Sequence, residues 1–180
     1  MKYNKTLKGI TLIELVIALA LSAIISAIMF SFYMPHQKAL AETEKRSQLQ
    51  MDAQNLMQYF SKSALEASKI TTLNGISGEA ELNSYTGNHT VSNIIFSVND
   101  INGTSQYTYK YVLDGRSLKY TDSKVTDKVI ANDINSIDIK PLNGQTVGKC
   151  SGISIIVELI SDDNRITYKV MDNLYFRNET

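Results

Sequence analysis

The chain has 180 residues, with 18 basic and 18 acidic side chains. Residues 1–9 hold three of the lysines and no acidic residue, so the rest of the chain has a net charge of −3. This mildly acidic balance argues against nucleic acid as a partner. Cys150 is the only cysteine, which excludes an intramolecular disulfide, so the fold must depend on its hydrophobic core.

The longest apolar stretch of the chain runs from Ile10 to Met34. Its 25 residues include one charged side chain, Glu14. As a helix this stretch would reach about 37 Å, enough to cross a hydrocarbon core of about 30 Å with some tilt. A carboxylate in a membrane-spanning helix is costly and by default marks a functional site.

A short basic segment precedes this stretch. It contains Lys2, Lys5 and Lys8, and such basic flanks stay on the cytoplasmic side of a membrane. We therefore expect a single-pass helix with its N-terminus inside and the chain from Pro35 onward outside. No small-residue cleavage site follows the apolar run, as it would in an ordinary secretory signal.

The junction of the two segments resembles the type IV pilin and pseudopilin family. Lys8-Gly9 is followed by Ile10-Thr11-Leu12-Ile13-Glu14-Leu15-Val16 and then by an unbroken apolar helix. The resemblance implies that a prepilin peptidase cuts between Gly9 and Ile10 and that the new N-terminus at Ile10 is methylated. The family more often has Phe or Met where this chain has Ile10.

The resemblance also gives Glu14 a role in assembly. Cleavage leaves a positive amine on Ile10 in apolar surroundings, one helical turn from Glu14. The carboxylate would pair with this amine, in its own chain or in a neighbouring subunit, and such a buried pair serves register more than stability. The plainer alternative is a signal-anchor helix with an incidental glutamate.

The helical pattern continues beyond the apolar stretch. Pro35 predicts a kink, because proline removes one helical hydrogen bond. From His36 to Lys69 there is no glycine or proline, and apolar residues recur at helical spacing from Leu49 to Leu65. We expect this amphipathic half, residues 36–74, to end at Asn74-Gly75 with Gly75 as its cap and to pack on the domain that follows.

Residues 75–180 change to the two-residue period of strands. Asp114-Gly115 and Asp162-Asp163-Asn164 predict hairpins. The predicted strands are Val91–Val98, Gln106–Leu113, Ser117–Thr121, Lys128–Ala131, Ile134–Lys140, Gly152–Ile160 and Arg165–Phe176. The expected fold is therefore α+β: an antiparallel sheet packed on the second half of a long helix, in a pilin-like lollipop.

The C-terminus carries a narrower resemblance. Leu174-Tyr175-Phe176-Arg177-Asn178, after the last hairpin, looks like the end of J-type minor pseudopilins and PilW-like minor pilins. This similarity favours a minor subunit, and the absence of a C-terminal cysteine pair favours either a minor subunit or a lineage that does without disulfides.

Other candidate sites have simpler explanations. His36 and His89 are the only histidines and are far apart in sequence, so a metal or catalytic site built on them is not expected. The oxygen-rich loops Asp162–Asn164 and Asn99–Gly103 lack the ligand pattern of a calcium site, although they leave that possibility open. Tyr107, Tyr109 and Tyr111 share one strand face and are expected to pack in the sheet.

The sequence therefore predicts four segments: a leader (1–9), a membrane-spanning or filament-core half-helix (10–35), an amphipathic half-helix (36–74) and a β-sheet domain (75–180). We expect a structural subunit of a type IV pilus or pseudopilus, not an enzyme, without cofactor or metal. Its partners would be other pilin subunits, the prepilin peptidase and the cytoplasmic membrane, and the assembled filament would lie at the cell surface. Motility, adhesion, DNA uptake and protein secretion stay open as roles. The alternative is a signal-anchored surface binding protein that does not assemble.

Overall fold

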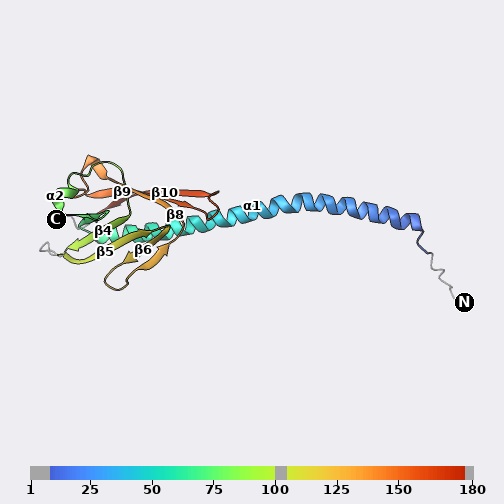
Figure 1. Cartoon of the computed structure of the whole chain (residues 1–180), viewed down its shortest axis with the longest axis horizontal. Helices are drawn as coiled ribbons and strands as arrows, with labels where there is room; N and C mark the ends of the chain where they lie inside the picture. Colours follow the sequence, from blue (N-terminus) through green and yellow to red (C-terminus); the bar gives the residue numbers. More distant parts are fainter. Residues whose placement is uncertain (1–8, 100–104, 177–180) are drawn as a thin grey trace. The chain divides into compact units, whose positions relative to one another are not determined.

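The computed structural model describes residues 9–99 and 105–176 (Figure 1). The contacts within the chain divide it into two compact units, Met1–Thr43 and Glu44–Thr180. Helix α1, Leu12–Glu66, supplies residues to both units. The α+β fold class is confirmed, because this long helix packs against antiparallel sheets in the second unit.

The part of α1 in the first unit has no buried residue. Every described side chain from Ile10 to Gln48 is exposed, although most of those up to Met34 are apolar. Pro35 lies inside the helix, and helical residues continue on both sides of it. The kink expected there stays a prediction.

The part of α1 in the second unit buries one stripe. The buried positions follow helical spacing: Leu49, Ala53, Leu56, Met57, Phe60, Ser63 and Ala64. Phe60 is completely buried and stacks on Tyr111, with ring centroids 4.3 Å apart. The amphipathic pattern that predicted a packed helix is therefore confirmed from Leu49 onward.

The helix ends earlier than the sequence pattern indicated. It stops at Glu66, and Lys69–Leu73 forms strand β1, so the helix predicted to reach residue 74 and its cap at Gly75 are wrong. Asn74-Gly75 is instead the turn between β1 and β2 (Ile76–Ser77), with φ of 52° and 81°. Two successive positive φ angles are typical of a tight hairpin turn, and β-branched Ile70, Thr71 and Thr72 favour a strand.

Two antiparallel sheets replace the one sheet that we expected. The six-stranded sheet has the order β2-β1-β4-β5-β6-β7, and the four-stranded sheet has the order β10-β9-β8-β3. The remaining strands are β3 (His89–Thr90), β4 (Asn93–Asn99), β5 (Ser105–Asp114), β6 (Ser117–Thr121), β7 (Lys128–Ala131), β8 (Ile134–Pro141), β9 (Gly152–Ile160) and β10 (Thr167–Tyr175). Two short helical pieces, α2 (Glu79–Leu82) and η1 (Leu142–Gly144), lie in the connections.

Both predicted hairpins are present. β5 and β6 join through Gly115 and Arg116, with a positive φ at Gly115, and β9 pairs with β10 along nine residues. Aromatic residues fill the core between helix and strands: Phe96 of β4 contacts Phe60, Tyr111 and Phe176. Tyr109 and Tyr111 are buried and Tyr107 is half-buried, which confirms that these tyrosines pack in the sheet.

Candidate functional site

The peptide bond between Gly9 and Ile10 lies just before α1. Neither residue belongs to a helix or strand, both are exposed, and the Ile10 side chain is 76% accessible. A peptidase must bind extended backbone, and here that backbone is free of helical hydrogen bonds. The leader residues 1–8 lie outside the described part of the chain.

Gly9 is not needed by the fold around it. A Cβ atom added at this position would meet no heavy atom within 4 Å, and its φ lies outside the left-handed region that favours glycine. Other glycines of the chain, such as Gly75 with φ of 81°, do have a conformational reason. If glycine is required at position 9, the requirement must come from an enzyme that recognises it.

Thr11 and Glu14 interact at the start of the helix. The Thr11 hydroxyl accepts from the Glu14 backbone N–H, while Glu14 Oε2 accepts from the Thr11 backbone N–H and hydroxyl, each at 3.4 Å. This reciprocal pattern is a capping box, which satisfies N–H groups left unpaired at a helix N-terminus. This role of Thr11 was not among the predictions, although the spacing Thr-x-x-Glu is typical of a capping box.

The Glu14 carboxylate has no cationic partner in the described part of the chain. It lies in the first turn of α1, where the partial positive charge of the helix N-terminus favours an anion. The uncut chain has no amine at Ile10, so pairing between Ile10 and Glu14 stays a prediction. The capping box holds the carboxylate within one turn of the place where cleavage would create that amine.

Three serine hydroxyl groups of the apolar helix that follows are hydrogen-bonded within the helix. Ser22, Ser26 and Ser31 donate to backbone carbonyls of Ala18, Ser22 and Ile28, at 2.9, 2.8 and 2.7 Å. These serines therefore need no water. Within α1 an 18-residue window of mean hydropathy 2.5 is long and apolar enough to cross a membrane, and none of it is buried by the chain itself.

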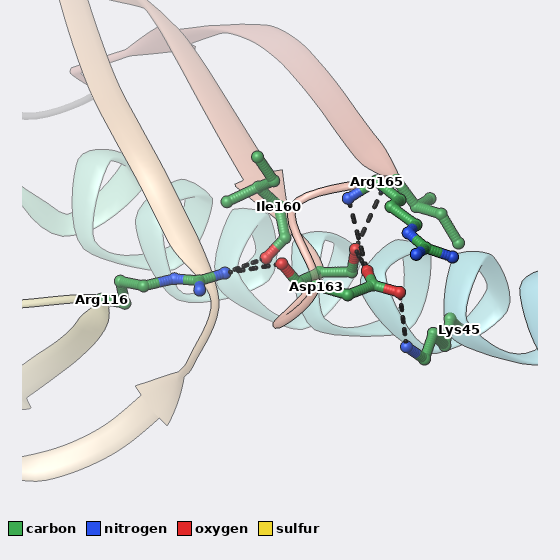
Figure 2. A network of polar contacts seen from close by, with 7 residues as sticks. Lys45, Arg116, Ile160, Asp163 and Arg165 are labelled. Atoms are coloured by element: carbon green, nitrogen blue, oxygen red, sulfur yellow. Dashed lines mark hydrogen bonds and ion pairs between the residues drawn. The ribbon is translucent and has the colours of Figure 1, made fainter.

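Asp163 takes part in a polar network in the second unit, shown in Figure 2. Its carboxylate accepts from the Ser161 hydroxyl at 2.6 Å and pairs with Lys45 of α1 at 3.1 Å. These contacts lower the pKa of Asp163 to about 2, the Ser161 hydrogen bond being the larger cause and Lys45 the next. In the same network the Arg116 guanidinium donates to the carbonyls of Ile160 and Ser161.

The two histidines belong to different units of the chain. His36 lies in the first unit, and His89 lies on β3, where Nε2 is 3.1 Å from the Thr86 carbonyl oxygen. No group of three or more His, Cys, Asp or Glu side chains suited to a metal occurs within residues 9–99 and 105–176. Of the two oxygen-rich loops, Asp100–Gly103 falls outside the described residues, as do Arg177 and Asn178 of the C-terminal motif.

The comparisons with known proteins agree with this N-terminal geometry. The family model of the prokaryotic N-terminal methylation motif matches residues 5–30, which contain the Gly9–Ile10 bond, the capping box and most of the apolar helix. No curated protein and no solved structure matches the chain significantly. Together with the exposed apolar helix, which is long and apolar enough to span a membrane, the motif supports a relationship to the type IV pilin and pseudopilin family.

Proposed function

We propose that this protein is a minor structural subunit of a type IV pilus or pseudopilus, not an enzyme. The observation that carries the proposal is the first part of α1, where the chain covers none of its own apolar side chains. Burying such a surface is strongly favourable, so it needs lipid before assembly and neighbouring helices afterwards. The minor class, PilW-like or J-type, rests on the short C-terminal motif at Leu174–Asn178.

The proposed sequence of events begins at the cytoplasmic membrane. The basic leader keeps the N-terminus inside, and α1 crosses the bilayer once with the sheets outside. The prepilin peptidase then hydrolyses the exposed Gly9–Ile10 bond, and Ile10 becomes the methylated N-terminus. Leaving the membrane, the apolar helix exchanges its lipid contacts for contacts with other pilin subunits.

Glu14 is the proposed assembly residue. Before cleavage its carboxylate caps the helix with Thr11, and after cleavage it neutralises the Ile10 amine of its own or a neighbouring subunit. An unpaired charge inside a filament core would be costly, so the pair favours the one axial position in which both charges are satisfied. Glu14 would therefore act on register, not on the fold of the sheets.

The first test is the processing of the chain in its native cells. We expect the N-terminus to be Ile10, with the added mass of a methyl group, and Gly9→Ala to leave nearly all of the protein uncut. Because an alanine Cβ meets nothing at position 9, Gly9→Ala should leave the unfolding of the sheets unchanged, which separates lost recognition from lost folding. An intact Met1, or a cut after the apolar run, would instead support the signal-anchored binding protein.

The second test concerns assembly. Glu14→Ala should be found in the membrane in normal amounts but depleted at least about tenfold from purified filaments, the fold-change that corresponds to about 1.4 kcal/mol. Glu42→Ala is the matched control, because it removes an exposed glutamate from the same helix outside the apolar segment. A Glu14→Ala subunit that enters filaments as well as the control does would remove the proposed role of this carboxylate.

A further inference from the structure

The apolar part of α1 is longer than a bilayer requires. As a helix, the 25 residues from Ile10 to Met34 rise about 37 Å, whereas the hydrocarbon core of a membrane is about 30 Å thick. About 7 Å of this stretch must therefore lie outside the core, unless the helix tilts. The end that extends decides whether Glu14 lies inside the hydrocarbon or at its surface.

Aromatic rings mark one end of the stretch. Between residues 10 and 43, phenylalanine and tyrosine occur only at Phe30, Phe32 and Tyr33, and His36 follows one turn later. The three aromatic side chains are 68%, 75% and 58% exposed, so the chain covers less than half of each. The polarity of the four rings increases along the helix, from two phenylalanines to a tyrosine hydroxyl and an imidazole. This order fits a surface at which hydrocarbon gives way to headgroups, where amphipathic rings are enriched.

These four residues, called here the aromatic belt, point to more than one side of the helix. Each residue turns a helix by about 100°, so Tyr33 lies about 60° from Phe30, whereas Phe32 lies about 160° from Phe30. His36 lies on the side of Phe32. A docked protein domain contacts one side of a helix, whereas a lipid layer surrounds it. The directions of the rings therefore favour lipid as the partner of the belt.

The capping box lies one core thickness away from the belt. From Glu14 to Tyr33 the helix rises about 28 Å, close to the thickness of about 30 Å of the hydrocarbon core. When Tyr33 lies at one surface of the core, Glu14 therefore lies at the other surface, where water can hydrate its charge. Both polar ends of the segment fit the two surfaces at once.

We propose that the aromatic belt binds the headgroup layer of the leaflet away from the cytoplasm and thereby sets the depth of α1. Glu14 then lies at the cytoplasmic surface of the hydrocarbon, and the spare helical length, residues 10–13, extends into the cytoplasmic headgroups. The Gly9–Ile10 bond is accessible to the peptidase there without movement of the helix. The proposal rests on the membrane span and orientation proposed above and adds the depth at which the helix is held.

Cysteine labelling of the uncut full chain in lipid nanodiscs tests this depth. Single cysteines are placed at positions 11–37, leaving out 14, and are treated with a maleimide that does not enter the bilayer. The unchanged chain is the blank, because Cys150 is buried. Labelling should be fast at positions 11–13 and from 34 onward, and at least about tenfold slower at positions 17–30.

Two other labelling patterns would have different meanings. A slow region from residue 10 to residue 29 would overturn the proposed depth and leave the membrane span in place. Fast labelling at every position would contradict the span itself, and with it the proposed function.

A thinner bilayer tests the belt as the anchor. When the core is about 5 Å thinner, a helix held at the belt exposes extra length at its cytoplasmic end. Labelling of Val16→Cys should then accelerate at least about tenfold, whereas labelling of Ser31→Cys should change less than about twofold. In a chain with Phe30→Leu, Phe32→Leu and Tyr33→Leu, Ser31→Cys should accelerate as well, because leucine has no preference for the headgroup layer.

The matched control combines Ile24→Leu, Ile25→Leu and Ile28→Leu, which changes as many apolar side chains but leaves the belt intact. Labelling of Ser31→Cys should stay slow in this chain. None of the substituted side chains in either variant is buried by the chain, so thermal unfolding of the sheets should be unchanged. If Ser31→Cys accelerates in thinner lipid while the belt is intact, the belt does not hold the helix and the proposal is wrong.

Discussion

The two parts of α1 are built from one continuous helix but bury their apolar side chains in different ways. In the first unit phenylalanines such as Phe30, which is 68% exposed, contact nothing that covers them. In the second unit Phe60 is completely buried among Phe96 and Tyr111. Up to Met34 the first part is apolar on all sides apart from Glu14 and a few hydroxyl groups, whereas the second part has one buried stripe and a polar face.

This difference shows where the stabilising partner of each part lies. A helix with one apolar stripe can bury that stripe against its own domain, and here two sheets cover it. A helix that is apolar all round needs an apolar environment on every side, which one chain of this size does not supply. In the proposed function, lipid and then neighbouring subunits would supply this environment for the first part.

The largest expected effect compares two phenylalanines of this helix. Phe60→Ala should lower the free energy of unfolding of the sheet domain by about 3–5 kcal/mol, because it leaves a cavity in the core. Phe30→Ala should change the same free energy by less than about 0.5 kcal/mol. Denaturant unfolding of the full chain in nanodiscs, followed by tyrosine fluorescence, measures both. A large effect of Phe30→Ala would show that the two parts are not independent.

A smaller effect is expected from a buried hydroxyl. The Tyr111 hydroxyl donates to the Tyr59 carbonyl at 2.9 Å and lies 2.6 Å from the Ser63 hydroxyl, so it ties β5 to α1. Tyr111→Phe should cost about 1–2 kcal/mol of unfolding free energy, because both α1 groups lose this partner. Tyr33→Phe, at an exposed position of the first part, is the matched control. Equal stability of the two variants would contradict a stabilising role for the hydrogen bonds between Tyr111 and α1.

The smallest effect concerns the contact at Lys45, four residues before the first buried helix residue, Leu49. The pKa of Asp163 is lowered to about 2, below its value of about 3.9 in an unfolded chain, so its stabilising contribution is present above pH 4 and is lost as the pH falls toward 2. Asp163→Asn should therefore lower the melting temperature slightly at pH 7 and not at pH 2.

High salt should shrink this difference, because both partners are well exposed. Glu42→Gln is the control, because it removes an exposed carboxylate of α1 that forms no ion pair in the described residues. Its effect on the melting temperature should depend neither on pH in this range nor on salt. If the difference in melting temperature between wild type and Asp163→Asn is the same at pH 2 as at pH 7, the stabilisation does not depend on the charge of Asp163.

Much of the fold could be predicted because local patterns and tertiary packing agree. Ser117–Thr121, Lys128–Ala131 and Gly152–Ile160 have the predicted limits, and both hairpin turns contain residues suited to them. The helix end was missed because the absence of glycine and proline up to Lys69 gave no stop signal, while Lys69–Leu73 pairs with β4 in the native structure. The division into two sheets depends on long-range pairing, which no local pattern carries.

The prediction of the candidate site rests on a different kind of signal. Gly9, Ile10 and Glu14 belong to a short motif whose spacing is visible in the sequence, and the match at residues 5–30 agrees with it. The spacing of Thr11 and Glu14 also indicates a capping box. Glu14 was interpreted instead as the partner of the amine that cleavage would create on Ile10. The absence of any steric need for Gly9 became known only from its surroundings in three dimensions.

The continuity of α1 has a consequence for the rate at which the sheet domain folds. Starting a helix is slow and unfavourable, with a nucleation constant on the order of 10⁻³, whereas extending an existing helix adds one hydrogen bond per residue. A bilayer forces the segment after Leu12 to be helical, since its backbone groups find no other partners there. If α1 spans a membrane as proposed, residues from Glu44 onward would extend a helix that already exists, and the membrane would act as a template for the helix on which both sheets pack.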